Sequence, residues 1–392
     1  AAYTEKSSEG VYSMQGAATC VDNSTGNVVA IVGSRSQEDI KGYVLNRAYQ
    51  SYRQPGSCIK PLNVYTPYLQ LGNTPDTKVT DSQIDGGPAN ADASYAGEMT
   101  LTDAVKWSKN TVAWNIYQQI TPKTGSSFLI KMGFHKIWVD KDYNAGALGG
   151  FTYGVTTEEM AGGYAALAND GVYRKATCIR LIVNASNKTV VNETNRDSKI
   201  YDKSASRMMT QMLREVVLSG TGTSANVENA VVAGKTGTTN ASKDVWFCGY
   251  SKYYTTTVWA GYDYPKEMSG VNSRVNAIFK DFMTAVHTNL PVTDFSTVTQ
   301  QTTQPETTAA VQEETQSLPQ ETTAIVPEME TTGIEQVTPQ QVPSTTAQVP
   351  TTTPYQRWTT APAQPKTTAP MQYGDIDATI RTDPDATARG EW

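Results

Sequence analysis

The sequence predicts a mixed α/β domain built on an antiparallel sheet, and three observations support this prediction. Apolar, strand-like segments occur near both ends of residues 1–296. Segments with the pattern of helices lie between them. Short polar turns separate the strands of each group, as antiparallel pairing requires. Strands at both ends of a helical middle can join one sheet with the helices packed against it.

The first elements are a hairpin and a helix that follows a Pro-Gly turn. Residues 15–33, QGAATCVDNSTGNVVAIVG, have the pattern of two apolar strands joined by a polar turn. The later run LNVYTPYLQLG predicts a helix that ends at Gly72. Pro61 lacks an amide hydrogen and is tolerated only in the first turn of a helix, so we expect Ser57 at or near the helix start.

The middle of the chain predicts further helices. Residues 100–132 begin TLTDAVKWSKNTVAWNIYQQI, which indicates short helices interrupted around Ser108. Residues 155–169, VTTEEMAGGYAALAN, predict another helix. Thr156 or Thr157 is its expected N-cap, and its acidic first turn suits the helix dipole.

The last third of the domain returns to a strand pattern. AVVAGKTGTT, DVWFCGYS and TTTVWAGYD are three β-rich segments separated by turns, so they predict a meander. Residues 273–290 then predict an amphipathic helix. Its apolar positions include Val275, Ile278, Phe279 and Phe282.

The composition changes at Thr297. Residues 297–392 are dominated by Thr, Pro, Gln, Ala and Glu, and such a segment cannot bury enough apolar surface to offset its ordering entropy. We therefore expect a globular domain over 1–296 and a disordered low-complexity tail over 297–392. The tail has 4 basic and 12 acidic residues, whereas residues 1–296 have 28 basic and 26 acidic residues. The nearly neutral domain gives no reason to expect a nucleic-acid partner.

Cysteine and histidine usage gives no sign of a metal site. The four cysteines are isolated from one another, and the chain has two histidines, so no zinc site is expected. The apolar contexts of the cysteines favour buried free thiols over disulfides. No stretch approaches the 18 apolar residues of a membrane span, and a chain that begins with Ala is expected to be a processed protein or an excised fragment.

Three short motifs supply the groups that a serine nucleophile needs. Ser57 and Lys60 are three residues apart in QPGSCIKPL, so a helix would bring the hydroxyl and the amine to one face. With two histidines in the chain, a Ser-His-Asp set is not available and lysine is the candidate base. The other two motifs lie at the helix break and at the end of an apolar strand: Ser108-Lys109-Asn110 and Lys235-Thr236-Gly237-Thr238.

Each of the last two motifs has a second copy, and context separates the copies. Lys123-Thr124-Gly125 follows a proline and precedes two serines, which is typical of a surface turn, whereas Lys235 ends an apolar run. Ser224-Ala225-Asn226 lies in a polar loop, whereas Ser108 precedes an apolar helix. We therefore expect the copies at 123 and 224 to be structural.

The order SxxK, SxN, KTG resembles that of penicillin-binding proteins and class A β-lactamases. The surrounding segments RQPGSCIKPL, ALGGFTYGVTTEEMAGGYAALANDGVY, GTGTSANVENAVVAGKTGTTN, DVWFCGYS and VWAGYD are similar to the transpeptidase domain of class A, bifunctional penicillin-binding proteins, over about residues 15–295. Thr239-Asn240 after KTGT favours class A. The resemblance implies helices on both faces of the sheet, a helical subdomain, and an upstream membrane anchor and glycosyltransferase domain in the intact protein.

The resemblance also implies a role for each motif residue. Ser57 would attack the penultimate D-Ala carbonyl of a peptidoglycan stem peptide, with Lys60 as its base. Burial and a nearby cation, expected to be Lys235, would lower the pKa of Lys60. Ser108 would relay the proton to the leaving amine, and Asn110 would hold the substrate amide. The substrate carboxylate would be bound by Lys235, Thr236, Gly237 and Thr238.

In this family no cofactor or metal is needed. The implied partners are a D-Ala-D-Ala donor, an amino-group acceptor on a neighbouring stem peptide, β-lactam antibiotics and other proteins of cell-wall synthesis. The implied location is the outer face of the membrane or the cell wall of a Gram-positive cell. Two alternatives stay open: a serine β-lactamase or D,D-carboxypeptidase that hydrolyses the same acyl-enzyme, and a non-catalytic wall-binding scaffold. A class A β-lactamase needs a glutamate in an ExxLN loop, and no such stretch lies between Asn110 and Lys235.

Overall fold

The computed structural model describes residues 3–8, 10–35, 44–192 and 197–297. The chain divides into two compact units, Ala1–Gln301 and Thr302–Trp392. The predicted disordered tail lies, from residue 298 onward, outside the described residues. The expected domain boundary at residue 297 therefore stays a prediction. Within the described ranges, no helix is long and apolar enough to cross a membrane.

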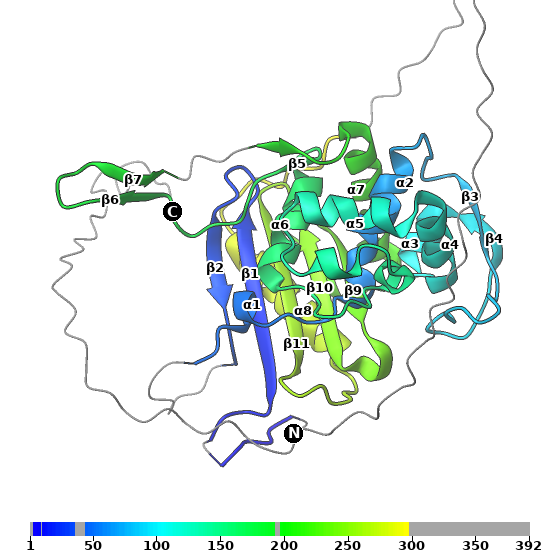
Figure 1. Ribbon diagram of the computed structural model, residues 1–392, viewed down its shortest axis with the longest axis horizontal. Helices are drawn as coiled ribbons and strands as arrows, with labels where there is room; N and C mark the ends of the chain where they lie inside the picture. The colour runs from blue at the N-terminus through cyan, green and yellow to red at the C-terminus, as the bar shows by residue number, and fades with distance from the viewer. Residues whose placement is uncertain (1–2, 9, 36–43, 193–196, 298–392) are drawn as a thin grey trace, which may run out of the picture. The chain divides into compact units, whose positions relative to one another are not determined.

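A five-stranded antiparallel sheet forms the centre of the first unit (Figure 1). Its strands lie in the order β2-β1-β11-β10-β9, and all neighbouring pairs are antiparallel. Strands β1 and β2 are the predicted hairpin and β9 to β11 are the predicted meander, so both predictions are confirmed. The bounds are β1 (Met14–Asp22), β2 (Val28–Val32), β9 (Ala233–Thr238), β10 (Asp244–Tyr250) and β11 (Tyr254–Tyr262).

Helices cover both faces of this sheet, as the resemblance implied. Successive side chains of a strand point to opposite faces. Accordingly, the Thr257 hydroxyl of β11 donates to a carbonyl of helix α6 (Thr157–Ala168), whereas its neighbour Thr256 contacts helix α8 (Asn272–Val286) through Met283. Helix α6 starts at the predicted N-cap Thr156, which forms a capping box with Glu159.

A helical subdomain lies beside the β9 side of the sheet (Figure 1). Helices α3 and α4 are separated at Ser108, as predicted. The bounds are α2 (Thr66–Leu69), α3 (Leu101–Lys106), α4 (Asn110–Ile120), α5 (Pro122–Lys131) and α7 (Lys203–Ser219). The shorter elements are α1 (Arg47–Gln50), β3 (Lys78–Asp81), β4 (Gly97–Thr100), η3 (Ile137–Asp140), η4 (Asn144–Leu148), β5 (Val172–Tyr173), β6 (Leu181–Val183), β7 (Thr189–Asn192), β8 (Ser198–Lys199), η5 (Thr223–Ala225) and η6 (Asn240–Ser242).

The cysteine prediction is confirmed at three positions and wrong at one. All four thiols are free, and Cys20, Cys58 and Cys248 are buried. Cys178 is exposed because it precedes the hairpin of β6 and β7, whose residues Leu181–Val183 are exposed as well. A surface hairpin of two strands has no layer above it to bury a thiol at its base.

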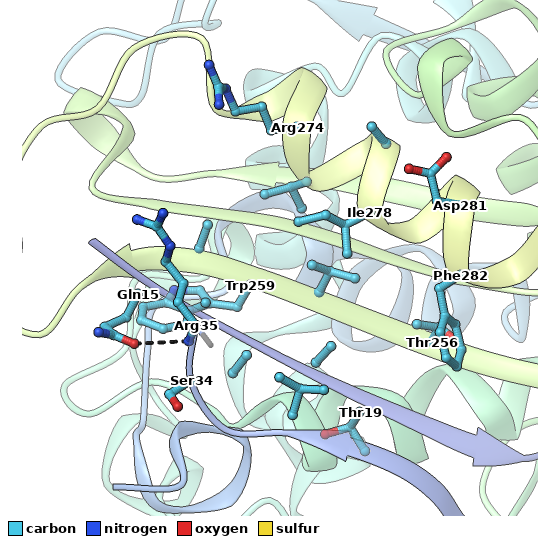
Figure 2. A pocket seen from close by; sticks show the side chains of 18 of the residues that line it. Gln15, Thr19, Ser34, Arg35, Thr256, Trp259, Arg274, Ile278, Asp281 and Phe282 are labelled. Carbon is cyan, nitrogen blue, oxygen red and sulfur yellow. Dashed lines mark hydrogen bonds between the residues drawn. The ribbon is translucent and has the colours of Figure 1, made fainter. Parts of the chain in front are cut away.

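An open cavity of about 610 Å³ lies between α8 and the sheet face of β1, β2 and β11 (Figure 2). Ile278 of α8 lines it and is 52% exposed, whereas Val275 and Phe279 of the same helix are fully buried. Its lining residues include none of the eight predicted site residues. The predicted chemistry therefore lies elsewhere in the domain.

Candidate active site

Ser57 lies in a short helix that changes its winding twice. A 3₁₀ turn, η1 (Gly56–Ile59), contains the serine, and a π-helical turn, η2 (Pro61–Tyr65), follows it before α2. Pro61 is the first residue of η2, where its missing amide hydrogen costs little. The prediction that Ser57 lies at a helix start is confirmed. The 3₁₀ winding also makes positions i and i+3 eclipse, which keeps Ser57 and Lys60 on one face.

The backbone just before Ser57 packs so closely against the sheet that Gly56 has no room for a side chain. Gly56 has φ +52°, and a Cβ there would lie 2.8 Å from the Thr238 carbonyl oxygen on β9. The Trp246 indole on β10 donates to the Gln54 carbonyl over 2.8 Å. The Pro-Gly turn therefore brings the backbone of the serine turn against strand β9.

Lys60 is fully buried and donates its hydrogen bonds to the break between α3 and α4. Its Nζ lies 2.9 Å from the Ser108 carbonyl, 2.8 Å from Asn110 Oδ1 and 3.4 Å from the Lys109 carbonyl. Among the described residues the Ser57 hydroxyl has no hydrogen bond. Since no hydrogen bond joins the Ser57 hydroxyl to Lys60 among the described residues, the predicted approach of hydroxyl and amine stays a prediction. The sequence gave no sign that the amine binds Asn110.

The two motif lysines have lowered pKa values. Burial and, second, the positive charge of Lys235 lower the pKa of Lys60 well below its ordinary value of 10.5. This confirms the predicted causes. Burial likewise lowers the pKa of Lys235, to about 8. Burial and the neighbouring cation thus favour the neutral form of Lys60, whereas Lys235 stays mostly charged at neutral pH.

Lys235 connects β9 to the helix break. Its Nζ donates to Ser108 Oγ over 2.8 Å and to the Thr236 carbonyl over 3.0 Å. Ser108 has φ +58°, a left-handed conformation that residues other than glycine seldom adopt. In this conformation the Ser108 carbonyl faces Lys60 and the Ser108 hydroxyl faces Lys235. Ser108 thus bridges the two lysines.

The rest of the third motif lies on the outer edge of β9. Thr236 is half-buried and shares a hydrogen bond with Thr221, whose Oγ1 lies 2.8 Å away. Thr238 is exposed and contacts Asn272 of α8. Gly237 faces η1, where a Cβ would lie 2.4 Å from the Pro55 carbonyl and 2.8 Å from Cys58 Sγ. Only glycine allows this close approach of the strand to the serine turn.

The structure thus brings the three predicted motifs together where η1, the α3–α4 break and β9 meet. The penicillin-binding protein transpeptidase domain model matches residues 16–284. The chain belongs to this family. The resemblance inferred from the motif order is therefore confirmed.

Curated relatives agree with the family assignment. The chain is 34% identical to penicillin-binding protein 4 of Bacillus subtilis over 265 residues, which is 66% of this chain and 42% of that protein. It is 36% identical to penicillin-binding protein 1A of Aquifex aeolicus over 298 residues, 72% of this chain and 39% of that protein. The chain therefore spans less than half the length of these relatives.

Solved structures share the fold at lower identity. The PonA1 protein from Mycobacterium tuberculosis in complex with penicillin V has a TM-score of 0.61 and 22% identity, with 72% of this chain and 81% of that chain covered. Penicillin-binding protein 1A from Haemophilus influenzae has a TM-score of 0.62 and 24% identity, with 73% of this chain and 49% of that chain covered. At these identities the likeness shows the transpeptidase-domain fold alone.

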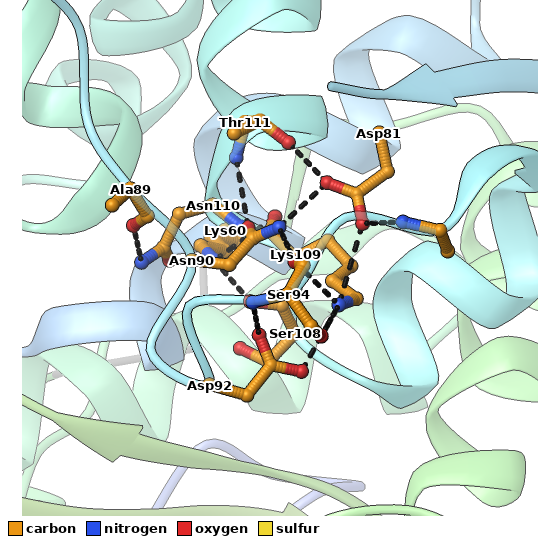
Figure 3. Close-up of polar contacts among 11 residues, drawn as sticks. Lys60, Asp81, Ala89, Asn90, Asp92, Ser94, Ser108, Lys109, Asn110 and Thr111 are labelled. Carbon is orange, nitrogen blue, oxygen red and sulfur yellow. Dashed lines mark hydrogen bonds and ion pairs between the residues drawn. The ribbon is translucent and has the colours of Figure 1, made fainter. Parts of the chain in front are cut away.

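The sequence did not point to the polar cluster behind the SxN motif of this transpeptidase domain (Figure 3). Buried Lys109 forms ion pairs with Asp81 at 3.3 Å and Asp92 at 3.0 Å. Buried Asn90 accepts from the backbone amide of Asn110 over 2.7 Å. Asp81 and Asn90 precede Ser108, the first residue of the motif, by 27 and 18 residues. No spacing rule links a strand end or a Gly-rich loop to a helix break. No local signal could have identified these residues.

The second copies of the two motifs lie outside this junction. Ser224 lies in η5 and is exposed, and its Oγ accepts from Asn276. Lys123 is exposed as predicted, but the expected surface turn is wrong. Residues Pro122–Lys131 form helix α5, which begins there because Pro122 occupies its first position and the Thr121 side chain caps it.

Proposed function

We propose that this domain is a serine D,D-transpeptidase that crosslinks peptidoglycan stem peptides and is acylated by penicillins. Ser57 attacks the penultimate D-Ala carbonyl, the bond to the terminal D-Ala breaks, and an ester forms on Ser57. An amino group of a neighbouring stem peptide then attacks the ester. A new amide forms and Ser57 regains its proton.

The proton on Ser57 passes to Lys60 in this proposal. Lys60 can act as a base because it is fully buried and its pKa is lowered by burial and by Lys235. From Lys60 a proton reaches the departing amine through Ser108, whose hydroxyl is bonded to Lys235. The observation that carries the proposal is the position of Ser108 between the two lysines, with its carbonyl 2.9 Å from Lys60 Nζ and its hydroxyl 2.8 Å from Lys235 Nζ, which supports a base and a proton route without histidine.

The remaining residues hold the substrate in the same proposal. Lys235, charged below pH about 8, faces the terminal carboxylate together with the hydroxyls of Thr236 and Thr238. Gly237 lets the strand edge approach the acyl group, and Asn110 holds the substrate amide. The backbone amides of Ser57 and Thr238 act as the oxyanion hole.

The proposed partners and location follow from the family. The substrates are a D-Ala-D-Ala donor and an amino-group acceptor in the wall, on the outer face of the membrane of a Gram-positive cell, and other cell-wall synthesis proteins act beside it. A membrane anchor and a glycosyltransferase domain would belong to other parts of the intact protein. The class A relatives' bifunctional character is therefore proposed for the intact protein and not for these residues.

Penicillin labelling tests the proposal. Incubation with benzylpenicillin should add the mass of one drug molecule to the peptide that contains Ser57, and the adduct should persist for many minutes. A β-lactam leaving group stays tethered to the acyl-enzyme and obstructs water. Ser57→Ala should gain no mass, with intact-protein and peptide mass spectrometry as the measurement.

Other outcomes would overturn the proposal. Many fast turnovers of penicillin with no lasting adduct would identify a β-lactamase. Release of D-Ala from a stem peptide without crosslinks, in the presence of an amino acceptor, would identify a carboxypeptidase. A folded protein that takes no label at all would indicate a non-catalytic scaffold.

A further inference from the structure

The side chain of Asn110 has its two ends held by different partners. Its Oδ1 accepts from Lys60 Nζ over 2.8 Å, and its Nδ2 donates to the Ala89 carbonyl over 2.9 Å. A backbone carbonyl can only accept, so the amide NH₂ has to face Ala89. The oxygen of Asn110 is thereby turned toward Lys60.

Asn90 holds the Ala89 carbonyl in place. Its Nδ2 donates to Asp81 Oδ1 over 2.6 Å and to the Ser94 carbonyl over 2.8 Å, and its Oδ1 accepts from the backbone amides of Asn110 and Thr111. With a relative exposure of 5%, Asn90 has both ends of its amide in use (Figure 3). It therefore joins its own loop to the first turn of α4.

Asp81 fixes Asn90 from behind. This carboxylate has no exposed surface and accepts from the Thr111 hydroxyl over 2.5 Å and from the Ala96 amide over 2.9 Å. It also pairs with the Lys109 ammonium, the neighbour of Asn110. Three residues of the SxN region are thus bound to one buried cluster.

We propose that Asn90 is a positioning residue, which keeps the Asn110 oxygen toward Lys60 and leaves the lone pair of the Lys60 amine to the Ser57 hydroxyl. This inference rests on the proposed function, because it assumes that Lys60 removes the proton of Ser57. It assigns a role to a residue that lies outside the three motifs.

The hydrogen count at Lys60 supports the proposal. A neutral amine has two N–H groups and one lone pair. Lys60 Nζ faces three acceptors, and a neutral amine keeps the two shorter contacts, with the Ser108 carbonyl at 2.9 Å and Asn110 Oδ1 at 2.8 Å, while it gives up the 3.4 Å contact with the Lys109 carbonyl. The lone pair is then left for Ser57, one 3₁₀ turn earlier. An Asn110 side chain turned the other way would present N–H to Lys60 and draw the lone pair away from Ser57.

The test compares Asn90→Ala with Asn23→Ala. Asn23 has a relative exposure of 1%, donates to the Ser251 carbonyl and accepts from Thr255, in the turn between β1 and β2. Both changes remove one buried, fully bonded asparagine without adding charge. We expect Asn90→Ala to lower the plateau rate of benzylpenicillin acylation at least about tenfold and Asn23→Ala to leave the rate per folded molecule unchanged.

The pH profile separates positioning from partial unfolding. Lys235 on β9 is the charged group that faces Lys60, while Ser57 on η1 is neutral and the Lys109 ammonium is paired with Asp81 and Asp92. Loss of the Asn110 oxygen as an acceptor disfavours the charged form of Lys60. The acid limb of the acylation rate should therefore move to lower pH, by about one unit, in Asn90→Ala. Partial unfolding would lower the labelled fraction and leave that limb in place.

Asn90→Ser provides a milder variant in case Asn90→Ala does not fold. Its hydroxyl can retain one of the lost hydrogen bonds, so both effects should be smaller and in the same directions. An unshifted limb and an unchanged rate in Asn90→Ser would overturn the inference. Wild-type protein that Ser57 does not label would instead overturn the proposed function, so the two failures are distinguishable.

Discussion

The triplet Lys-Thr-Gly occurs in two regions of the domain with opposite surroundings. On β9, Lys235 is fully buried, bonded to Ser108, and has its pKa lowered to about 8. At the start of α5, Lys123 is exposed to solvent and no ion pair or hydrogen bond of its side chain is present among the described residues. The same three residues therefore produce one buried cation at a junction of motifs and one solvated helix residue.

The threonines and glycines of the two copies are more alike than the lysines. Thr236 shares a hydrogen bond with Thr221 and Thr124 shares one with Thr121, at 2.8 Å and 3.0 Å. Gly237 and Gly125 both face a backbone carbonyl, at 2.4 Å from the position of an added Cβ. Close packing at the glycine is thus no sign of function. A functional site therefore differs from a chance copy of its motif in two ways: its lysine is buried, and other functional groups face that lysine.

The largest expected effect is the difference in acylation rate between Lys235→Ala and Lys123→Ala. Lys235→Ala should lower the rate of benzylpenicillin acylation at least about a hundredfold, because a buried cation that faces the drug carboxylate is lost. Lys123→Ala should change the rate little, since its side chain is in water. Stopped-flow or quenched labelling of both variants measures the difference. Comparable losses in the two variants would show that β9 was wrongly chosen as the carboxylate-binding strand.

A smaller effect is expected from raising the pH. The pKa of Lys235 is lowered to about 8, so its charge is present below that pH and is lost above it. At pH 9 about a tenth of the molecules keep the charge, and acylation by benzylpenicillin should fall roughly tenfold from its plateau. A penicillin ester, which lacks the carboxylate, should show a much weaker fall.

On the acid side of the pH profile of acylation, the rate falls because a lysine gains a proton, whereas on the alkaline side it falls because Lys235 loses one. Lys60 must be neutral to act as a base, and its pKa is lowered. Acylation should therefore fall as the pH falls through that lowered pKa, for the drug and its ester alike. A flat profile above pH 8 with both compounds would contradict the role of Lys235 while leaving that of Lys60 intact.

Local patterns were sufficient to predict the sheet and several of its helices, but they gave no prediction for α7 and a surface turn where α5 begins. The β1–β2 hairpin, the β9–β11 meander and the capped helix α6 follow from apolar period and turn residues, which act over a few neighbours. The three motifs could be ordered into a site because a family resemblance linked segments that are far apart in the chain. Neither local pattern nor motif order indicates a side chain's hydrogen-bond partner.

The parts that were missed depend on contacts between distant segments. Asp81 and Asn90 are ordinary strand and loop residues in the sequence, and their burial against Lys109 appears only when the loop folds over α4. The exposure of Cys178 likewise depends on distant contacts, since its neighbour Thr177 pairs with Asn27 while Leu181–Val183 of the following hairpin stay exposed. The Lys60–Asn110 bond falls in the same class, since it joins two motifs that are 50 residues apart.

The smallest expected effect concerns the threonine pairs. Thr221→Val removes the hydroxyl partner of Thr236 while preserving side-chain shape, so the Thr236 hydroxyl should lose its fixed direction. We expect acylation to slow by about three- to tenfold, the scale of one neutral hydrogen bond. The matched variant Thr121→Val removes the partner of Thr124 and the N-cap of α5.

Thr121→Val should lower the free energy of unfolding and leave the acylation rate unchanged. Loss of a threonine N-cap lowers the free energy of unfolding by about 1 kcal/mol, which thermal or urea unfolding can measure. Its acylation rate per folded molecule should equal that of the wild type, because α5 contributes no group to the junction of η1, the α3–α4 break and β9. Thr221 is exposed and lies at that junction, so Thr221→Val should lower the acylation rate and leave the free energy of unfolding unchanged. If both variants lost stability alone, the Thr236 hydroxyl would have no part in binding, and the difference between the two copies would reduce to their lysines.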